Sequence, residues 1–261
     1  MRRRSQSGVM GSFTESLRLA WEMTSRWDPA LWSVVGLSLQ VSGLATLIGA
    51  LTGMAFGAWL AVARFPGQRL LVAMLNTLLA LPSVVVGLAV YLLLSRSGPL
   101  GAWGILFTPA AMVIAQTVLV VPVVMALTRQ LVADAAQGNG EQLRSLGARP
   151  AAVSGLLLLH ERWALLTVLL TAFGRAVSEV GAVMIVGGNI AGVTRVMTTT
   201  IALETSKGDL ALALGLGFVL LGVVAAINLG IAALQWLQRE HEASGRGASD
   251  TAVSRADGGL P

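Results

Sequence analysis

Charged and reactive side chains are scarce in this chain of 261 residues, which contains no cysteine, two histidines and a single lysine. The absence of cysteine excludes a disulfide framework, a thiolate zinc site and a cysteine nucleophile. Only 12% of the residues are charged, whereas 55% are hydrophobic and the mean hydropathy is +0.75. A soluble domain could not bury that much apolar surface, so we expect an integral membrane protein in contact with lipid.

The basic residues lie in short clusters between apolar runs, and seventeen of the eighteen are arginine. The formal net charge is +5 and the isoelectric point is near 11.2. This distribution is typical of membrane topology rather than of a nucleic-acid-binding face, so we expect no nucleic-acid partner.

Five apolar runs are long enough to cross a bilayer, which needs about 20 residues per helix. The first run, of about 33 residues, is too short for two crossings and predicts one tilted helix. We therefore predict an all-α fold, a polytopic bundle of about five transmembrane helices. The runs are residues 31–63, 70–94, 105–127, 163–186 and 210–237.

Two short segments flank the predicted membrane domain, residues 31–238. Residues 1–30 are either an irregular lead-in or a surface-lying amphipathic helix. Residues 239–261 are rich in glycine, serine and alanine with few large apolar side chains, which predicts disorder. The apolar face of the amphipathic alternative consists of Phe13, Leu17, Ala20, Trp21 and Thr24, opposite Glu15, Arg18, Glu22 and Arg26.

Small residues and prolines mark the apolar runs. Gly49, Gly53 and Gly57 recur every four residues, which predicts that a second helix approaches this face closely. Pro82 and Pro122 each remove a backbone donor, so we expect a kink at each.

The arginines also orient the bundle, because loops rich in lysine and arginine stay in the cytoplasm. Five spans place the termini on opposite sides, with the N-terminus outside and the C-terminus inside. The arginine-rich residues 1–30 would then lie outside, in conflict with the same rule. The predicted cytoplasmic side carries Arg64, Arg69, Arg129, Arg144, Arg149 and Arg162, against Arg96, Arg195 and Lys207 on the other side.

The longest polar stretch of the membrane domain, residues 128–162, predicts a short helix from Glu141 to Gly147. Glu141 suits the start of a helix and a glycine suits its end. This segment resembles the EAA loop of ABC-transporter permeases, a short cytoplasmic coupling helix that inserts into the ATPase, although Gln142 stands where that pattern usually has alanine. The resemblance implies an ATPase-coupling role for Glu141, Leu143, Arg144, Leu146 and Gly147.

A second resemblance covers residues 31–237 and is carried by FGRAVSEVGA at 173–182 and by the polar stretch 187–204. These residues are similar to the tungstate branch of the molybdate/tungstate permeases. The resemblance implies a multi-pass permease of a bacterial or archaeal cytoplasmic membrane. Because five helices alone enclose little pathway, we expect it to work as a homodimer. The resemblance also implies a cytoplasmic ABC ATPase, an extracytoplasmic oxyanion-binding protein, and tungstate as the solute, with molybdate or sulfate as alternatives.

The chain cannot power transport by itself. A P-loop needs Gly-Lys followed by serine or threonine, and the single lysine, Lys207, is followed by Gly208. We therefore expect ATP to be used by a partner subunit, and we expect no cofactor, metal site or catalytic residue in this chain.

Charged residues inside an apolar run are costly, so they are expected to face a partner or a watery path. Arg175 and Glu179, one helical turn apart, could line the solute route or form a structural ion pair. Amide, guanidinium and hydroxyl donors further along suit a tetrahedral oxyanion, or an external loop that contacts a binding protein. The candidate pathway residues are Arg175, Ser178, Glu179, Asn189, Arg195, Thr198 and Thr199.

Two other function classes stay open on the residues alone. An intramembrane enzyme could use Glu179 with Ser178 or His160, and it would be active without an ATPase. A membrane scaffold would tolerate neutral replacement of Arg175 and Glu179 together.

Overall fold

The computed structural model describes residues 14–22, 24–25, 28–145 and 149–257, with side chains described outside 138–145 and 234–257. Within these ranges every regular element is a helix, which confirms the predicted all-α fold. The chain divides into two compact units, Met1–Leu220 and Leu221–Pro261. The second unit consists, in its described part, of the continuation of the last helix.

The first apolar run forms one unbroken helix, α2 (Pro29–Val62), as predicted. Asp28 caps its start, because the carboxylate accepts a hydrogen bond from the Ala30 amide at 2.9 Å, and proline is favoured at the next position. The helix ends before a tight turn, in which the Gln68 side-chain amide donates to the Leu60 carbonyl at 2.9 Å.

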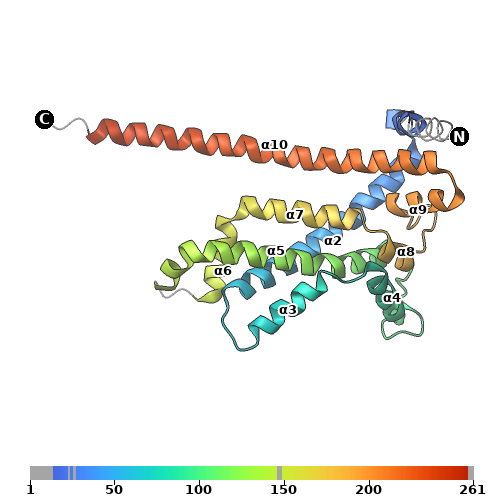
Figure 1. Cartoon of the computed structure of the whole chain (residues 1–261), viewed down its shortest axis with the longest axis horizontal. Helices are drawn as coiled ribbons and strands as arrows, with labels where there is room; N and C mark the ends of the chain where they lie inside the picture. The colour runs from blue at the N-terminus through green and yellow to red at the C-terminus, as the bar shows by residue number, and fades with distance from the viewer. Residues whose placement is uncertain (1–13, 23, 26–27, 146–148, 258–261) are drawn as a thin grey trace, which may run out of the picture. The chain divides into compact units, whose positions relative to one another are not determined.

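Helix α5 (Pro109–Ser145) packs against α2, which crosses it obliquely in Figure 1. A Cβ atom added at Gly53 would lie 2.9 Å from the Val124 Cβ, and one added at Gly57 would lie 2.5 Å from the Met125 carbonyl oxygen. The close approach predicted from the glycine spacing is therefore confirmed. Such contacts hold membrane helices together through dispersion, since lipid supplies no hydrophobic driving force between them.

The second span is broken at Pro82, where a kink is predicted. Helix α3 (Gln68–Leu78) and helix α4 (Ser83–Leu94) meet at an angle of 97°. Pro122, in contrast, lies inside α5 without ending it.

The fourth span is not the single helix predicted over residues 163–186. Helix α6 (Pro150–His160) bends by 82° into α7 (Arg162–Val177), and α7 stops before a separate short helix, α8 (Gly181–Gly187). At this break, side chains take the place of backbone partners in the helical hydrogen bonds. The Ser178 hydroxyl donates to the Arg175 carbonyl, and the Glu179 carboxylate accepts a hydrogen bond from the Ala182 amide.

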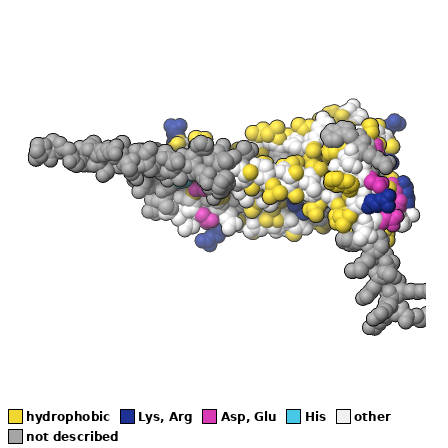
Figure 2. Space-filling model, turned by 90° about the horizontal axis from the view of Figure 1, so that it is seen from above, with side chains coloured by type: hydrophobic (Ala, Val, Ile, Leu, Met, Phe, Trp, Pro, Cys, Tyr) yellow, Lys and Arg dark blue, Asp and Glu magenta, His cyan; other side chains and the backbone are white. Residues whose placement is uncertain are grey.

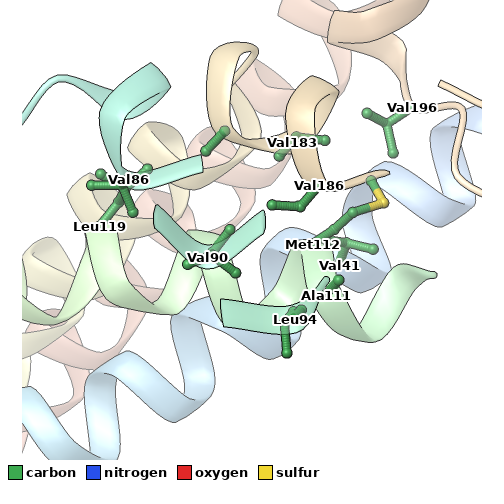
Figure 3. Close-up of a cluster of buried hydrophobic side chains, with 12 residues drawn as sticks. Val41, Val86, Val90, Leu94, Ala111, Met112, Leu119, Val183, Val186 and Val196 are labelled. Atoms are coloured by element: carbon green, nitrogen blue, oxygen red, sulfur yellow. The ribbon is translucent and has the colours of Figure 1, made fainter. Parts of the chain in front are cut away.

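The two broken spans touch at their breaks. A Cβ atom at Gly181 would lie 2.8 Å from Val84 Cγ2, and one at Gly87 would lie 2.7 Å from the Ala182 Cα. Helices α4 and α8 thus pack backbone to backbone over α5. The apolar cluster that they form with α2 and α5, seen in Figure 3, includes Val41, Val86, Val90, Met112, Val183 and Val186.

Helix α9 (Met197–Lys207) and helix α10 (Leu210–Asp257) complete the chain, with the short 3-10 turn η1 (Gly101–Trp103) between α4 and α5. The α10 backbone is helical to Asp257, including part of the segment for which the sequence predicts disorder. Residues 14–22 are helical as well. Their backbone lies close to Gly215, where an added Cβ atom would be 3.1 Å from the Ser16 carbonyl oxygen, and Leu17 and Trp21 are 51% and 74% exposed.

In the part of the chain that the structure describes, three helices are long and apolar enough to cross a bilayer, and the number rises to five if each bent pair counts as one span. Large apolar side chains such as Leu51, Leu92 and Leu221 remain exposed, as expected for a surface that contacts lipid. On the face shown in Figure 2, hydrophobic side chains cover the middle and charged side chains gather mainly towards the ends.

Replacing Gly57 with alanine should weaken the α2–α5 contact by about 1–3 kcal/mol, because the new methyl group meets backbone rather than a flexible side chain. The matched control is Gly43→Ala in the same helix, where nothing lies within 4 Å of the added Cβ. That control should be neutral or stabilising by up to about 1 kcal/mol, since alanine favours helix. Thermal unfolding of both purified variants in detergent measures the difference; equal stability would contradict the packing argument.

Candidate functional site

Glu179 ties the start of α8 to α9. Its carboxylate accepts the Ala182 amide at 3.1 Å, and its backbone carbonyl accepts the Thr198 hydroxyl at 2.8 Å. The Glu179 residue is 9% exposed, whereas Arg175 lies on the exposed face of α7. Among the described residues no ion pair joins Arg175 to Glu179, so the structural pair considered from the sequence is not formed.

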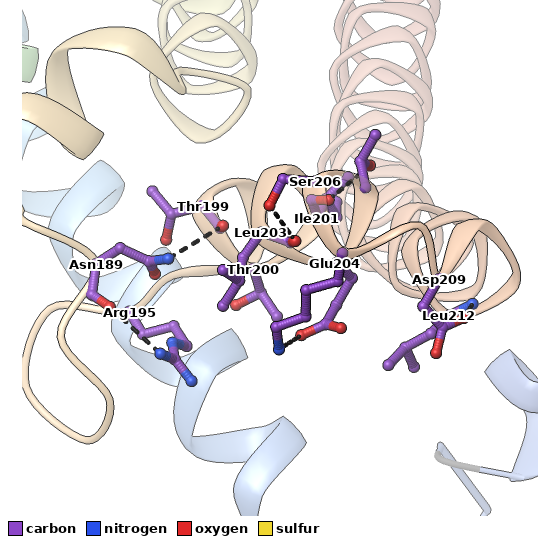
Figure 4. Close-up of polar contacts among 12 residues, drawn as sticks. Asn189, Arg195, Thr199, Thr200, Ile201, Leu203, Glu204, Ser206, Asp209 and Leu212 are labelled. Atoms are coloured by element: carbon purple, nitrogen blue, oxygen red, sulfur yellow. Dashed lines mark hydrogen bonds and ion pairs between the residues drawn. The ribbon is translucent and has the colours of Figure 1, made fainter.

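The predicted residues beyond α8 form a second cluster, shown in Figure 4. The Asn189 side-chain amide donates to the Thr199 carbonyl at 3.5 Å, and an Arg195 guanidinium nitrogen donates to the Asn189 carbonyl at 3.4 Å. The structure therefore brings Asn189, Arg195 and Thr199 together, while Thr198 points to Glu179 instead.

The cluster has unused hydrogen-bonding capacity. Asn189 Oδ1 and Arg195 Nε are buried without a partner within the part of the chain that the structure describes. The threonine hydroxyls, in contrast, are already engaged: Thr199 accepts the Val196 amide and donates to its carbonyl, at 3.1 and 3.0 Å. Of Asn189 Oδ1 and Arg195 Nε, only the latter is a donor, so Arg195 is the group of this cluster best able to meet an anion.

Sequence reasoning missed a polar cavity between α2, α5 and α9. It has room for about one water molecule. Gln116 donates to the Ala176 carbonyl at 2.9 Å and leaves its own carbonyl oxygen buried without a partner among the described residues. The signal was present in the sequence, because Ser38, Ser42 and Thr46 recur every four residues in an apolar helix. The cavity is lined by Ser38, Val41, Ser42, Gln116, Val177, Val196 and Thr198.

The predicted coupling residues lie at the end of α5 rather than in a separate helix that starts at Glu141. The α5 backbone stays helical to Ser145 and so includes Glu141, Leu143 and Arg144, although Gly138 and Gly140 are poor helix formers. Leu146 and Gly147 lie outside the described residues.

An enzyme site is not assembled here. The Ser178 hydroxyl donates to the Arg175 carbonyl and the Glu179 carboxylate accepts a backbone amide, so the two side chains do not form a nucleophile and base pair. Within the described ranges, no group of three histidine, aspartate or glutamate side chains lies close enough to hold a metal ion.

Comparison with known proteins identifies the family. The tungstate uptake system permease protein TupB of Peptoclostridium acidaminophilum is 42% identical over 230 residues, which cover 87% of this chain and 99% of that protein. The chain belongs to the ABC-transporter permease family. A probable anion ABC transporter permease protein of Haloferax volcanii is 38% identical over 76% of this permease and 88% of its own length.

A second tungstate uptake system permease protein, from Campylobacter jejuni, is 38% identical over 63% of this permease and 69% of its own length. No family model matches the chain. The relatives are named as permeases rather than enzymes, which agrees with the absence of a nucleophile and base pair at Ser178 and Glu179.

Glu179→Ala should destabilise this permease by about 1 kcal/mol, because the α8 amide loses its acceptor. Glu179→Gln keeps an acceptor oxygen and should retain both stability and uptake. Thermal unfolding in detergent and uptake into vesicles measure the two effects. A Glu179→Gln variant that is stable but inactive would show that the negative charge itself acts in transport.

Proposed function

We propose that this permease is the membrane subunit of an ATP-driven importer that carries tungstate into the cytoplasm. The observation that supports it best is the 42% identity to a tungstate uptake permease over 99% of that relative's length. The importer would comprise two copies of this chain, two copies of a cytoplasmic ABC ATPase and an extracytoplasmic oxyanion-binding protein. Molybdate and sulfate, which are tetrahedral anions as well, are the competing solutes.

Coupling to the ATPase would act on the end of α5. Glu141 belongs to the same unbroken helix as Val120 and Val124, which pack against α2 and α7 in the centre of the bundle. A displacement of the helix end by the ATPase is therefore carried directly into the core, because packed helices move as rigid bodies. Alternating access would follow from such a motion in both copies.

The positive charge for the oxyanion would come from arginine. Arg175 lies exposed on α7, and Arg195 holds the Asn189 carbonyl while its Nε has no partner among the described atoms. Glu179, Thr198 and Thr199 have intramolecular hydrogen-bond partners, so in this proposal they maintain the shape of the path. Ser178 lies beside the break between α7 and α8. The path would thus avoid presenting the Glu179 charge to the anion.

The outer surface would contain α9 and the start of α10. Lys207 pairs with Glu204 at 2.8 Å, and Asp209 caps α10 by accepting the Leu212 amide at 3.0 Å (Figure 4). Such a mixed-charge surface suits the docking of the binding protein. This orientation places the N-terminus outside, the C-terminus in the cytoplasm and α5's end beside the ATPase.

Glu141→Lys should reduce co-purification of the ATPase, because the new charge replaces an acidic group in the proposed contact. The matched control is Glu204→Lys, the same charge reversal on the proposed outer surface, which should leave ATPase binding unchanged. Co-purification from membranes with equal permease levels measures both variants. Unchanged ATPase recovery with Glu141→Lys would exclude this segment as the coupling site.

Arg175→Ala should lower tungstate uptake at least about tenfold while assembly with the ATPase is retained, because a dianion loses its cation in a poorly solvated path. Arg175→Lys should restore part of the uptake. Elemental analysis of cells supplied with limiting tungstate, molybdate and sulfate measures the effect and the choice of solute together. If the unmodified protein takes up molybdate or sulfate in preference to tungstate, that anion is the substrate and the assignment of tungstate is wrong.

A further inference from the structure

Helix α7 has an apolar buried face and a polar exposed face. Val168, Ala172 and Ala176 pack against α5 in one buried cluster. On the adjoining side of the helix, every fourth residue is polar and exposed: Thr167, Thr171 and then Arg175. An exposed polar stripe is unfavourable against lipid tails, so water or protein must cover it in the membrane.

The stripe forms one wall of a groove of about 440 Å³ between α7 and α5. Helix α5 contributes Gln130 and Asp134 to the groove, and α7 contributes Thr167 and Thr171. Apolar side chains form the rest of its lining: Leu127, Leu131, Ala164 and Val168. A groove of this size admits a tetrahedral oxyanion with water around it.

The ends of this polar surface carry opposite charges. Arg175 lies eight residues beyond Thr167, about 12 Å along α7. Asp134 lines the groove itself, about 10 Å along α5 from Glu141. No cation is among the groove's lining residues, so an anion that leaves Arg175 meets hydroxyl groups and then a carboxylate.

We propose that the α5–α7 groove is the inner half of the oxyanion path. Thr167 and Thr171 line this path and contact the water in it, and the negative charge of Asp134 repels the anion toward the cytoplasm. This inference rests on the proposed function and adds to it the route after Arg175. Weak contacts suit such a route, because a conducted ion must leave each site easily. The Thr171 hydroxyl already donates to the Thr167 carbonyl at 2.9 Å, so it would contact a passing anion only weakly and would not bind it tightly.

The absence of cysteine in the chain allows a direct test with single cysteine substitutions in the complete permease–ATPase complex. Thr167→Cys and Thr171→Cys should react with a charged, membrane-impermeant thiol reagent in inside-out vesicles at least about tenfold faster than lipid-exposed controls. The controls are Leu51→Cys and Leu92→Cys, which replace side chains that are 69% and 58% exposed.

Labelling of Thr171→Cys should also change when the ATPase is trapped with nucleotide, because the path opens and closes in the cycle. Labelling no faster than the controls would overturn the proposal. A disulfide between the two copies at position 171 in every nucleotide state, with no labelling, would identify a packed interface and overturn it as well. If labelling responds to nucleotide but tungstate is not taken up, the path stands and the assignment of the solute fails.

Asp134→Lys tests the expulsion step. The lysine should hold the oxyanion in the groove and lower uptake about tenfold, while the loaded binding protein still stimulates ATP hydrolysis. The matched variant Asp134→Asn removes the repulsion without adding attraction and should reduce uptake less. Wild-type uptake by Asp134→Lys would show that Asp134 does not act on the anion.

Discussion

The close contact between α2 and α5 is the constraint on which the rest of this bundle depends. Three glycines on α2 allow the α5 backbone to reach the α2 surface, and the same stretch of α5 supports α7 on another side. Because membrane helices gain little from hydrophobic association, contacts at this distance supply the stabilisation. A helix held so firmly from both sides can transmit a displacement from its end to its centre.

Two broken spans meet on this rigid pair. One span is interrupted between Leu78 and Ser83, with Pro82 at the start of its second half, and Ser178 and Glu179 lie in the break between α7 and α8. The halves α4 and α8 then pack backbone to backbone through Gly87 and Gly181. Non-helical backbone within a membrane protein is tolerated where protein covers it, and here Thr198 satisfies the Glu179 carbonyl inside the break.

Polar residues of the membrane domain fall into two groups once their partners are known. Glu179, Thr198 and Thr199 satisfy backbone groups and hold helix ends in place. Arg175 and the groove between α5 and α7 present their polar groups outward. Arg175 in particular suits contact with a moving anion, because within the described residues its side chain has no structural bond to break in order to meet it.

The sequence alone determined the membrane class, the single helix α2, the glycine contact and the kink at Pro82, because hydropathy, small-residue spacing and proline act locally. The motifs at 173–182 and 187–204 also identified the family, which the relatives then confirmed. The sequence could not reveal that residues 163–186 form two helices, since this break depends on hydrogen bonds from Ser178 and Glu179 and on the fit of Gly181 against α4. Tertiary packing likewise decided that Thr167 and Thr171 line a groove with Gln130 and Asp134, because these α5 and α7 residues are brought together by long-range contacts.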